Sequence, residues 1–265
     1  MNKSVININD VTCFIGVDRI LDSVSFDVSR GERVSILGPN GAGKSTLLRC
    51  VMRILPVSSG SISIDGTDTL RMPRKKLASR VGYVPQHQGG SCPFSVEEYV
   101  LLGRYPHLSP FSFAGDKDRD VAMKALERTG MGNFSERSFD TLSGGERQMV
   151  QIAAVMAQGV EVLLLDEPSV YLDPGHRSGL MKLLSALNSE EGMAIVTVTH
   201  NINEAILSGG KMIMLREGKI IFTGEPGLAI SSGKLEELFG KQFVYCEHPV
   251  TGDAMVLPDG RWGNE

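Results

Sequence analysis

The sequence predicts an α/β fold, in which an antiparallel β subdomain and an α-helical subdomain are attached to a mainly parallel sheet. Three observations support this prediction. A glycine-rich turn follows an apolar strand at 33–37 and leads into a helix. Apolar runs at 162–165 and 194–199 are separated by a helical stretch, which is typical of buried parallel strands. Residues 88–160 differ from both, because prolines interrupt them and their apolar residues follow a helical spacing.

The chain has 265 residues, 42% of them hydrophobic, which is enough to bury a substantial core. We expect a single domain over 1–265. Within it, segments 1–87 and 161–240 form the core together with the antiparallel sheet. Segment 88–160 forms the helical subdomain, and 241–265 is a C-terminal extension. No internal repeat or low-complexity linker separates these parts.

Composition excludes several classes of function. The formal net charge is −4, so no basic surface for nucleic acid is expected. The four cysteines are widely spaced, which predicts free thiols in a reducing cytoplasm, and no histidine joins them in a metal-ligand pattern. No apolar run reaches the roughly 18 to 20 residues of a membrane-spanning helix. If the protein serves a membrane, we therefore expect another chain to cross it.

The N-terminal segment has the two-residue period of half-buried antiparallel strands. Ile6 and Ile8 alternate with asparagines, and the apolar residues of 24–28 alternate with polar ones. A further strand and turn are expected at 61–66. These strands predict the antiparallel sheet beside the core.

Two helices are predicted in the middle of the chain. Ser95 and Glu98 have the spacing of a capping box, which begins a helix that runs to Leu102. A second helix is expected over 116–129, with Gly130 at its end. They form the helical subdomain.

Further elements follow the apolar strand at 162–165. We expect a helix over about 177–187 and a hairpin formed by 212–215 and 219–222. The last residues, 242–265, suggest a small hairpin with turns at 251–252 and 259–260.

The glycine-rich turn fits the pattern G-x-x-x-x-G-K-[ST], a phosphate-binding loop. Its glycines allow successive N–H groups to converge on an anion, its lysine adds a positive charge, and the following helix N-terminus also favours the anion. Such a turn could simply join a strand to a helix, but the complete match favours nucleotide phosphate. Kinases, GTPases and transport ATPases share this loop. The expected binding residues are Gly38, Pro39, Asn40, Gly41, Ala42, Gly43, Lys44, Ser45 and Thr46.

Polar side chains follow three other apolar strands. They are Gln86, the pair Asp166 and Glu167, and His200. Because ligands of open parallel sheets bind beyond the carboxyl ends of the strands, we expect these groups to surround one nucleotide. Read separately, they are ordinary carboxylates at a strand end and surface Gln and His residues.

The chemistry of these side chains suggests distinct roles. Asp166 suits Mg²⁺, which the Ser45 hydroxyl would also bind. Glu167 is then placed to orient and deprotonate the water that attacks the γ-phosphate, as a general base does. Gln86 and His200 would sense the γ-phosphate and that water.

A second motif comprises Leu142 and the four residues Ser143, Gly144, Gly145 and Glu146. Ser143 and Glu146 form a capping box, which by itself indicates only a well-capped helix. The two glycines would also expose N–H groups at a helix N-terminus, a second anion site. If this turn belongs to the helical subdomain, it would reach only the nucleotide of a second copy. A two-fold, head-to-tail pair satisfies both copies.

Together and in this order, these motifs resemble those of the ATP-binding cassette (ABC) ATPases, a class of P-loop NTPase, over nearly the whole chain. The resemblance implies that the cofactors are ATP and Mg²⁺ and that two copies enclose ATP. It implies a signature loop at 142–146, communication between the two sites through Asp173, and a γ-phosphate switch at His200. Phe14 matches the aromatic position that stacks on adenine, where the family commonly has Tyr; alternatively it is a core residue. The implied catalytic residues are Lys44, Gln86, Glu167 and His200, and the implied Mg²⁺ ligands are Ser45, Gln86 and Asp166.

Shorter segments resemble the ATPases of importers for iron-siderophores, haem and cobalamin. These segments are 103–107, 171–173, 248–252 and 256–258. Related zinc and manganese importers carry similar segments, so importers of those metals are an alternative.

The resemblance therefore implies an ATPase subunit of an importer. It would lie on the cytoplasmic face of the membrane as a peripheral protein, bound to transmembrane permease subunits and served indirectly by an extracytoplasmic substrate-binding protein. Nucleic acid is not an expected partner. The rival hypotheses are a soluble ABC ATPase that acts outside transport and a small-molecule kinase, which would leave Ser143 to Glu146 unexplained.

Overall fold

The computed structural model describes residues 4–86, 91–109, 112–250 and 252–259. Its centre is a six-stranded sheet in the order β10-β9-β3-β8-β7-β6. All neighbours in it are parallel except β9 and β10, which form the predicted hairpin. The strands are β3 (Arg33–Leu37), β6 (Val81–Val84), β7 (Val162–Asp166), β8 (Ala194–Thr199), β9 (Lys211–Arg216) and β10 (Lys219–Gly224).

The register of this sheet brings four carboxyl ends together. Leu37 pairs with Thr199, and Leu165 pairs with both Thr197 and Val84. The segments that follow β3, β6, β7 and β8 therefore leave the sheet side by side. This arrangement confirms the predicted parallel sheet.

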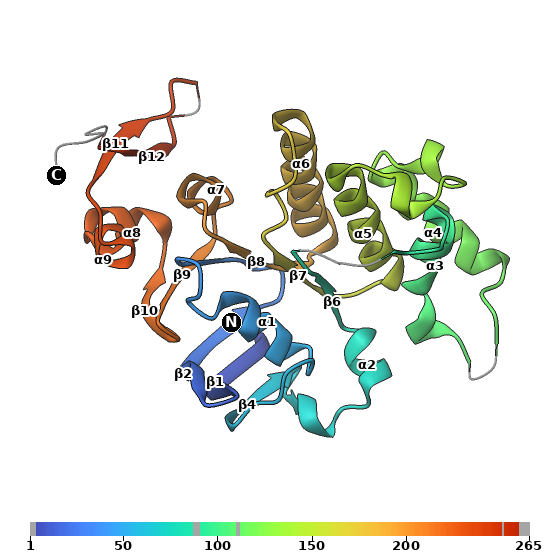
Figure 1. Ribbon diagram of the computed structural model, residues 1–265, viewed down its shortest axis with the longest axis horizontal. Coiled ribbons are helices and arrows are strands. Elements are labelled where there is room, and N and C mark those ends of the chain that lie inside the picture. Colours follow the sequence, from blue (N-terminus) through green and yellow to red (C-terminus); the bar gives the residue numbers. More distant parts are fainter. Residues whose placement is uncertain (1–3, 87–90, 110–111, 251, 260–265) are drawn as a thin grey trace.

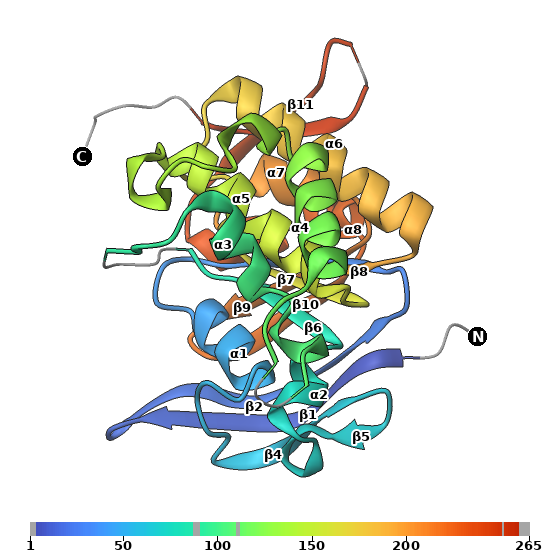
Figure 2. The same cartoon turned by 90° about the vertical axis from the view of Figure 1, so that its right-hand side faces the viewer.

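A second sheet is antiparallel and has the order β2-β1-β4-β5. It lies below the central sheet in Figures 1 and 2. Helix α1 packs between the two sheets, and its apolar residues share one buried cluster with both. The elements are β1 (Ser4–Ile15), β2 (Asp18–Ser29), β4 (Ser59–Ile64), β5 (Thr67–Asp68), α1 (Lys44–Val51) and α2 (Arg74–Ala78).

Charged side chains join the two sheets at the amino ends of the parallel strands. Arg30 pairs with Asp65 and Glu161, and Arg80 pairs with the same two acids. The antiparallel subdomain is thus fixed to the core on the edge opposite the carboxyl ends.

The helical part lies to the right of the sheet in Figure 1 and in front in Figure 2. It contains α3 (Val96–Leu102), α4 (Asp116–Arg128) and α5 (Gly144–Gln158). The capping box of Ser95 and Glu98 begins α3 as predicted. Apolar residues of these helices share a second buried cluster with α6 (Pro174–Glu191) and with β7. Helix α6 is longer than the predicted 177–187, because Asp173 caps it and Pro174 suits its first turn.

The C-terminal part covers the other end of the sheet. It comprises α7 (Ile202–Leu207), α8 (Pro226–Ser231), α9 (Lys234–Phe239), β11 (Phe243–Glu247) and β12 (Ala254–Pro258). Strands β11 and β12 form the predicted hairpin, although Thr251 and Gly260 of its expected turns lie outside the described residues. The side chain of Asn203 on α7 makes two hydrogen bonds to the backbone of Val256, of 2.8 and 3.0 Å. Within the described ranges, no helix has both the length and the apolar character needed to cross a bilayer.

Candidate active site

The turn after β3 forms a pocket of about 450 Å³, lined by residues 40–46. Two glycines are required by close contacts. A Cβ on Gly38 would collide with the carbonyl oxygen of Leu215, and one on Gly43, whose φ is 99°, would lie 2.8 Å from the carbonyl oxygen of Ile20. The turn can therefore form only where these positions lack side chains.

Lys44 is the buried cation of this pocket. Its side chain is 5% exposed, and Nζ donates to the carbonyl oxygens of Gly38 at 2.8 Å and Pro39 at 3.0 Å. Burial lowers the pKa of Lys44, while the nearby Glu167 and Asp166 oppose this effect. The ammonium group is thus hydrogen-bonded to neutral carbonyl oxygens, and an anion in the pocket would be a direct charged partner for it.

Asp166, the last residue of β7, is 1% exposed. Its carboxylate accepts hydrogen bonds from Ser45 Oγ at 2.9 Å and from Tyr83 Oη at 3.2 Å. Burial raises the pKa of Asp166, and burial likewise raises the pKa of Tyr83 to about 12, so the phenol remains a donor. No local pattern indicated a role for Tyr83, because its position depends on the pairing of β6 with β7.

The oxygen donors of Ser45 and Asp166 fit Mg²⁺. Among the described residues, no three His, Cys, Asp or Glu side chains form a group that could hold a metal by themselves. Magnesium is commonly bound by one or two protein oxygens while phosphate and water complete its shell. The site therefore suits a cation that arrives with a phosphate ligand. Gln86, the third expected ligand, donates a hydrogen bond to Glu167 in this structure, and its role as a ligand stays a prediction.

Glu167 is the point where three strand ends meet. Its Oε2 accepts a hydrogen bond from Gln86 Nε2 at 2.9 Å and lies 3.0 Å from His200 Nδ1. The side chain is nearly buried, and the backbone φ of 50° is unusual for a residue other than glycine. Strain of this kind often accompanies functional sites, where it is maintained by surrounding contacts.

The second motif begins α5 in the predicted way. Ser143 Oγ accepts a hydrogen bond from the N–H of Glu146 at 3.3 Å, and Glu146 Oε2 accepts one from the N–H of Ser143 at 2.7 Å. Hydrogen bonds from Ser143 lower the pKa of Glu146. Ser143 and Gly144 are exposed, and none of residues 143–146 lines the phosphate-loop pocket. The chain therefore does not bring its two anion sites together within one copy.

Asp173 lies at the exposed start of α6. Its Oδ1 accepts from the N–H of His176 at 2.9 Å, and its Oδ2 lies 2.7 Å from His176 Nδ1. These bonds lower the pKa of Asp173. The preceding residues pack on the second motif, since Cβ atoms added to Gly144 and Gly145 would each lie 3.2 Å from Tyr171 or Leu172.

Phe14, the aromatic residue expected to stack on adenine, lies half exposed near the end of β1. Ile15 and Ile20 line the phosphate-loop pocket, and Phe14 is not among its lining residues. Side chains alternate along β1, so Phe14 and Ile15 point to opposite faces of the strand. Stacking of Phe14 on adenine stays a prediction, and Ile15 is a second candidate that the sequence did not single out.

Comparison with known proteins decides the family. The family model described as ABC transporter matches residues 21–170, more than half of the chain and nearly all of the elements that carry the pocket. The chain belongs to the ABC transporter family. It is an ABC ATPase with the mixed α/β fold, antiparallel β subdomain and helical subdomain that the sequence predicted.

Relatives of this ABC ATPase match along almost its full length. The ferric enterobactin transport ATP-binding protein FepC of Escherichia coli (strain K12) is 35% identical over 263 residues, covering 98% of this chain and 97% of FepC. A solved inward-facing structure assigned to the metal-chelate type of ABC transporter has a TM-score of 0.84 at 27% identity, and covers 97% of this chain and 98% of that one. The dimeric ATP-binding cassette MJ0796 bound to ADP and Pi has a TM-score of 0.74 at 29% identity, and covers 83% and 98%.

Proposed function

We propose that this ABC ATPase hydrolyses ATP to power the import of a metal chelate of the iron-siderophore or haem type. The observation that carries the chemistry is the convergence of Gln86, Glu167 and His200 beside the phosphate-binding loop. The proposed substrate class is supported by the full-length similarity to FepC and to the metal-chelate type of transporter.

The phosphate loop would bind the triphosphate. Its backbone N–H groups and Lys44 would hold the β- and γ-phosphates, and Ser45 and Asp166 would hold Mg²⁺, which neutralises charge that develops on the phosphates. Ile15, rather than Phe14, would contact the adenine. Because Asp166 is already oriented by Ser45 and Tyr83, little rearrangement is needed for it to bind a cation.

Glu167 would be the general base. Its carboxylate would orient the attacking water and accept a proton from it. Gln86 and His200 both contact one oxygen of this carboxylate, so they fix its orientation, and its other oxygen takes part in neither contact. The backbone of Glu167 is strained as well, which is common at functional sites.

Two copies would enclose the nucleotide. The exposed turn of Ser143 to Glu146 does not line the pocket of its own chain, so its helix N-terminus would bind the γ-phosphate held by a second copy. A two-fold axis places both turns on both nucleotides. The similarity to the dimeric cassette MJ0796 supports this arrangement, and Asp173 would lie between the two sites.

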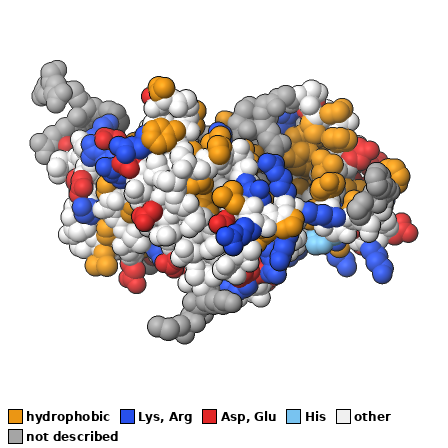
Figure 3. All heavy atoms as spheres, turned by 90° about the horizontal axis from the view of Figure 1, so that it is seen from below, with side chains coloured by type: hydrophobic (Ala, Val, Ile, Leu, Met, Phe, Trp, Pro, Cys, Tyr) orange, Lys and Arg blue, Asp and Glu red, His pale blue; other side chains and the backbone are white. Residues whose placement is uncertain are grey.

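A permease would bind beside the helical subdomain. A groove of about 340 Å³ between β6 and α5 is lined by Tyr83, Tyr99, Leu102 and Gln151. Figure 3 shows hydrophobic side chains gathered on the side of the molecule where the helical subdomain lies. Exposed apolar residues of this region include Phe94, Leu102, Tyr105 and Phe113. Such a patch suits an apolar segment of a membrane protein, which would hold this chain at the cytoplasmic face.

Uptake of labelled iron chelate tests the proposal. Cells that express the chain with its permease and binding protein should take up the chelate, and Glu167→Gln should lower uptake and ATP hydrolysis by about two to four orders of magnitude. The exposed Glu190→Gln on α6 is the matched control, and it should behave as the wild type. Zinc or manganese uptake in place of chelate uptake would support the alternative substrate, and hydrolysis without any permease-dependent uptake would support a non-transport ATPase.

A further inference from the structure

A run of four cations lies on α2 and in the turn before it. Arg71, Arg74, Lys75 and Lys76 are all exposed, and we call them the basic patch. The sequence from 69 to 96 contains no Asp or Glu. Because the chain as a whole has a net charge of −4, these cations are concentrated against its overall balance. A local surplus of positive charge on an acidic protein indicates a surface that meets a negatively charged partner.

Three members of the basic patch have no carboxylate partner within the chain. Among the described residues, Arg71, Arg74 and Lys76 form no ion pair. Arg80, which follows α2 closely, instead pairs with two acids at the amino edge of the sheet. The charges of the three unpaired cations are therefore not neutralised by the fold, and an anion outside the chain can approach them without displacing an internal partner.

Lys75, the fourth member, connects the basic patch to the helical subdomain. Its Nζ donates to the carbonyl oxygen of Leu108 and lies 5.9 Å from the centroid of the Tyr105 ring. The side chain of Tyr105 is 70% exposed, and that of Leu70, just before the patch, is 66% exposed. Cations next to exposed aromatic and aliphatic side chains are typical of proteins that lie on a bilayer surface, where the apolar groups reach below the headgroups.

The basic patch borders the groove that is proposed to bind the permease. Gln158 lines this groove and donates a hydrogen bond to the carbonyl oxygen of Ala78 at the end of α2. None of the four cations lines the groove itself. Figure 3 shows Lys and Arg side chains beside the hydrophobic side chains of the helical subdomain on this face. A permease segment in the groove would therefore leave the patch uncovered, next to the bilayer that contains the permease.

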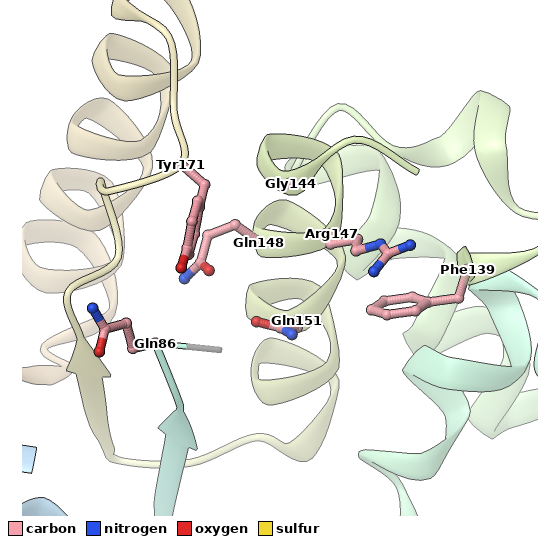
Figure 4. Close-up of a pocket in the computed structure, with 7 residues that line it drawn as sticks. All are labelled: Gln86, Phe139, Gly144, Arg147, Gln148, Gln151 and Tyr171. Carbon is pink, nitrogen blue, oxygen red and sulfur yellow. The ribbon is translucent and has the colours of Figure 1, made fainter. Parts of the chain in front are cut away.

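The basic patch is separate from the catalytic edge. The groove shares Gln151 with a cavity of about 120 Å³ between α5 and the end of β6, and this cavity shares Gln86 with the phosphate-loop pocket (Figure 4). No member of the patch lines the cavity or that pocket. Substitutions in the patch should thus leave the chemistry of ATP hydrolysis unchanged.

We propose that the basic patch binds the anionic headgroups of phospholipids at the cytoplasmic surface of the membrane. Each cation close to such a surface strengthens membrane binding about fivefold. The attraction would turn the face that carries the groove toward the bilayer and so present it to the permease. An acidic protein segment or a nucleic acid would supply negative charge without the apolar layer that suits Leu70 and Tyr105. The inference rests on the proposed place of the chain beside a permease.

Flotation of the purified full-length chain with lipid vesicles tests the proposal. The chain should bind vesicles of phosphatidylglycerol and phosphatidylcholine at least about tenfold more tightly than vesicles of phosphatidylcholine alone, and added sodium chloride should reduce the difference. The double variant Arg74→Gln, Lys76→Gln should bind the anionic vesicles about 10- to 30-fold more weakly. The matched control Lys182→Gln, Lys241→Gln removes two exposed cations elsewhere and should bind within about threefold of the wild type.

Two further measurements identify the partner. ATP hydrolysis by the Arg74→Gln, Lys76→Gln variant should stay within about twofold of the wild type, because the patch lies outside the catalytic edge. Inorganic phosphate in place of chloride at equal ionic strength should leave vesicle binding unchanged, since a charged surface differs from a pocket for one phosphate ion.

Four outcomes would overturn the proposal. They are equal binding to both kinds of vesicle, equal weakening in the double variant and its control, displacement by inorganic phosphate, and a preference for poly-glutamate or double-stranded DNA over anionic vesicles. The proposed function would fail in a different way, if the chain bound anionic vesicles as expected but supported no permease-dependent uptake.

Discussion

The two anion sites of this chain are built in opposite ways. The phosphate loop keeps Lys44 and Asp166 buried, and it depends on glycines that are enclosed by neighbouring backbone. The turn at Ser143 is exposed, and its groups are satisfied by a local capping box. The first site is therefore organised by the tertiary fold, which keeps two charged groups buried at a cost in free energy. The second site is organised by four consecutive residues. We expect the first site to bind nucleotide in a single copy of the chain, and the second site to contact nucleotide only in a dimer.

The sharpest test of this contrast is Lys44→Ala. Removing the buried cation takes away a charge-assisted hydrogen bond to phosphate, so we expect ATP affinity to fall about 10- to 100-fold. Calorimetric titration of the isolated chain measures this change. The conservative Lys44→Arg is the control for charge alone, and it should also bind weakly because the lysine's two carbonyl partners fit only the smaller head group. Unchanged affinity in Lys44→Ala would show that the backbone N–H groups suffice.

Ser143→Ala should weaken the dimer and leave the ATP affinity of the single chain unchanged. The substitution removes a hydroxyl that would contact the γ-phosphate held by the second copy, and a hydrogen bond to a charged group is worth about 1.5–3 kcal/mol, so we expect an ATP-dependent dimer that is about 10- to 100-fold weaker. Affinity of the monomer for ATP should stay within twofold, because residue 143 does not line its own pocket. Analytical ultracentrifugation with ATP measures the dimer in the slowly hydrolysing Glu167→Gln variant, with and without Ser143→Ala. Titration of the monomer with ATP measures nucleotide affinity separately. Weaker binding by the monomer would mean that both sites act within one copy.

The acids of the two sites should respond to pH with opposite sign. Burial raises the pKa of Asp166, so ionised Asp166 destabilises the nucleotide-free fold, and this effect is relieved as the pH falls through its folded pKa. Hydrogen bonds lower the pKa of Glu146, so its stabilisation is present at neutral pH and is lost as the pH falls below the ordinary range of a glutamate. Asp166→Asn should therefore raise the melting temperature by about 2–4 °C at pH 7 and by less at pH 5.

The melting temperature of Glu146→Ala tests the acid of the second site in the same way. It should lower the melting temperature at pH 7 and have less effect at acid pH, where the wild-type cap is protonated. Glu146→Gln, which can still accept from the N–H of Ser143, is the control and should stay near the wild type. A shift of the same sign for Asp166→Asn and Glu146→Ala at pH 7 would contradict the contrast between the sites.

The smallest expected effect concerns the adenine. Ile15→Ala should weaken ATP binding about three- to tenfold by removing apolar contact area, whereas Phe14→Ala should change it less than twofold. Competition between ATP and GTP for each variant reports on base contact separately from phosphate contact. A larger loss for Phe14→Ala would restore the aromatic residue to the site.

The same contrast explains how much could be predicted from sequence. The phosphate loop and both capping boxes are local patterns, and the structure confirms the capping of α3 and α5. The meeting of strand ends followed from the general behaviour of parallel sheets. Tyr83 and Ile15 were not predicted, because their roles depend on strand pairing and on which face of β1 meets the loop.

Short helices were also not predicted. Helices α7, α8 and α9 have six residues each, too few to give a periodic signal or to be stable alone. They are held by a third buried cluster that includes Met212 and Met214 of the sheet.

The two hydrogen bonds between the Asn203 side chain and the Val256 backbone affect how this protein can be truncated. Deleting the final hairpin would strip both partners from the Asn203 amide and uncover the apolar surface that Val256 covers. Helix α7 starts only two residues after His200, so the damage would begin beside the catalytic edge. Truncated material should thus precipitate or lose activity through misfolding, and a purification tag is better attached after the last strand than in place of it.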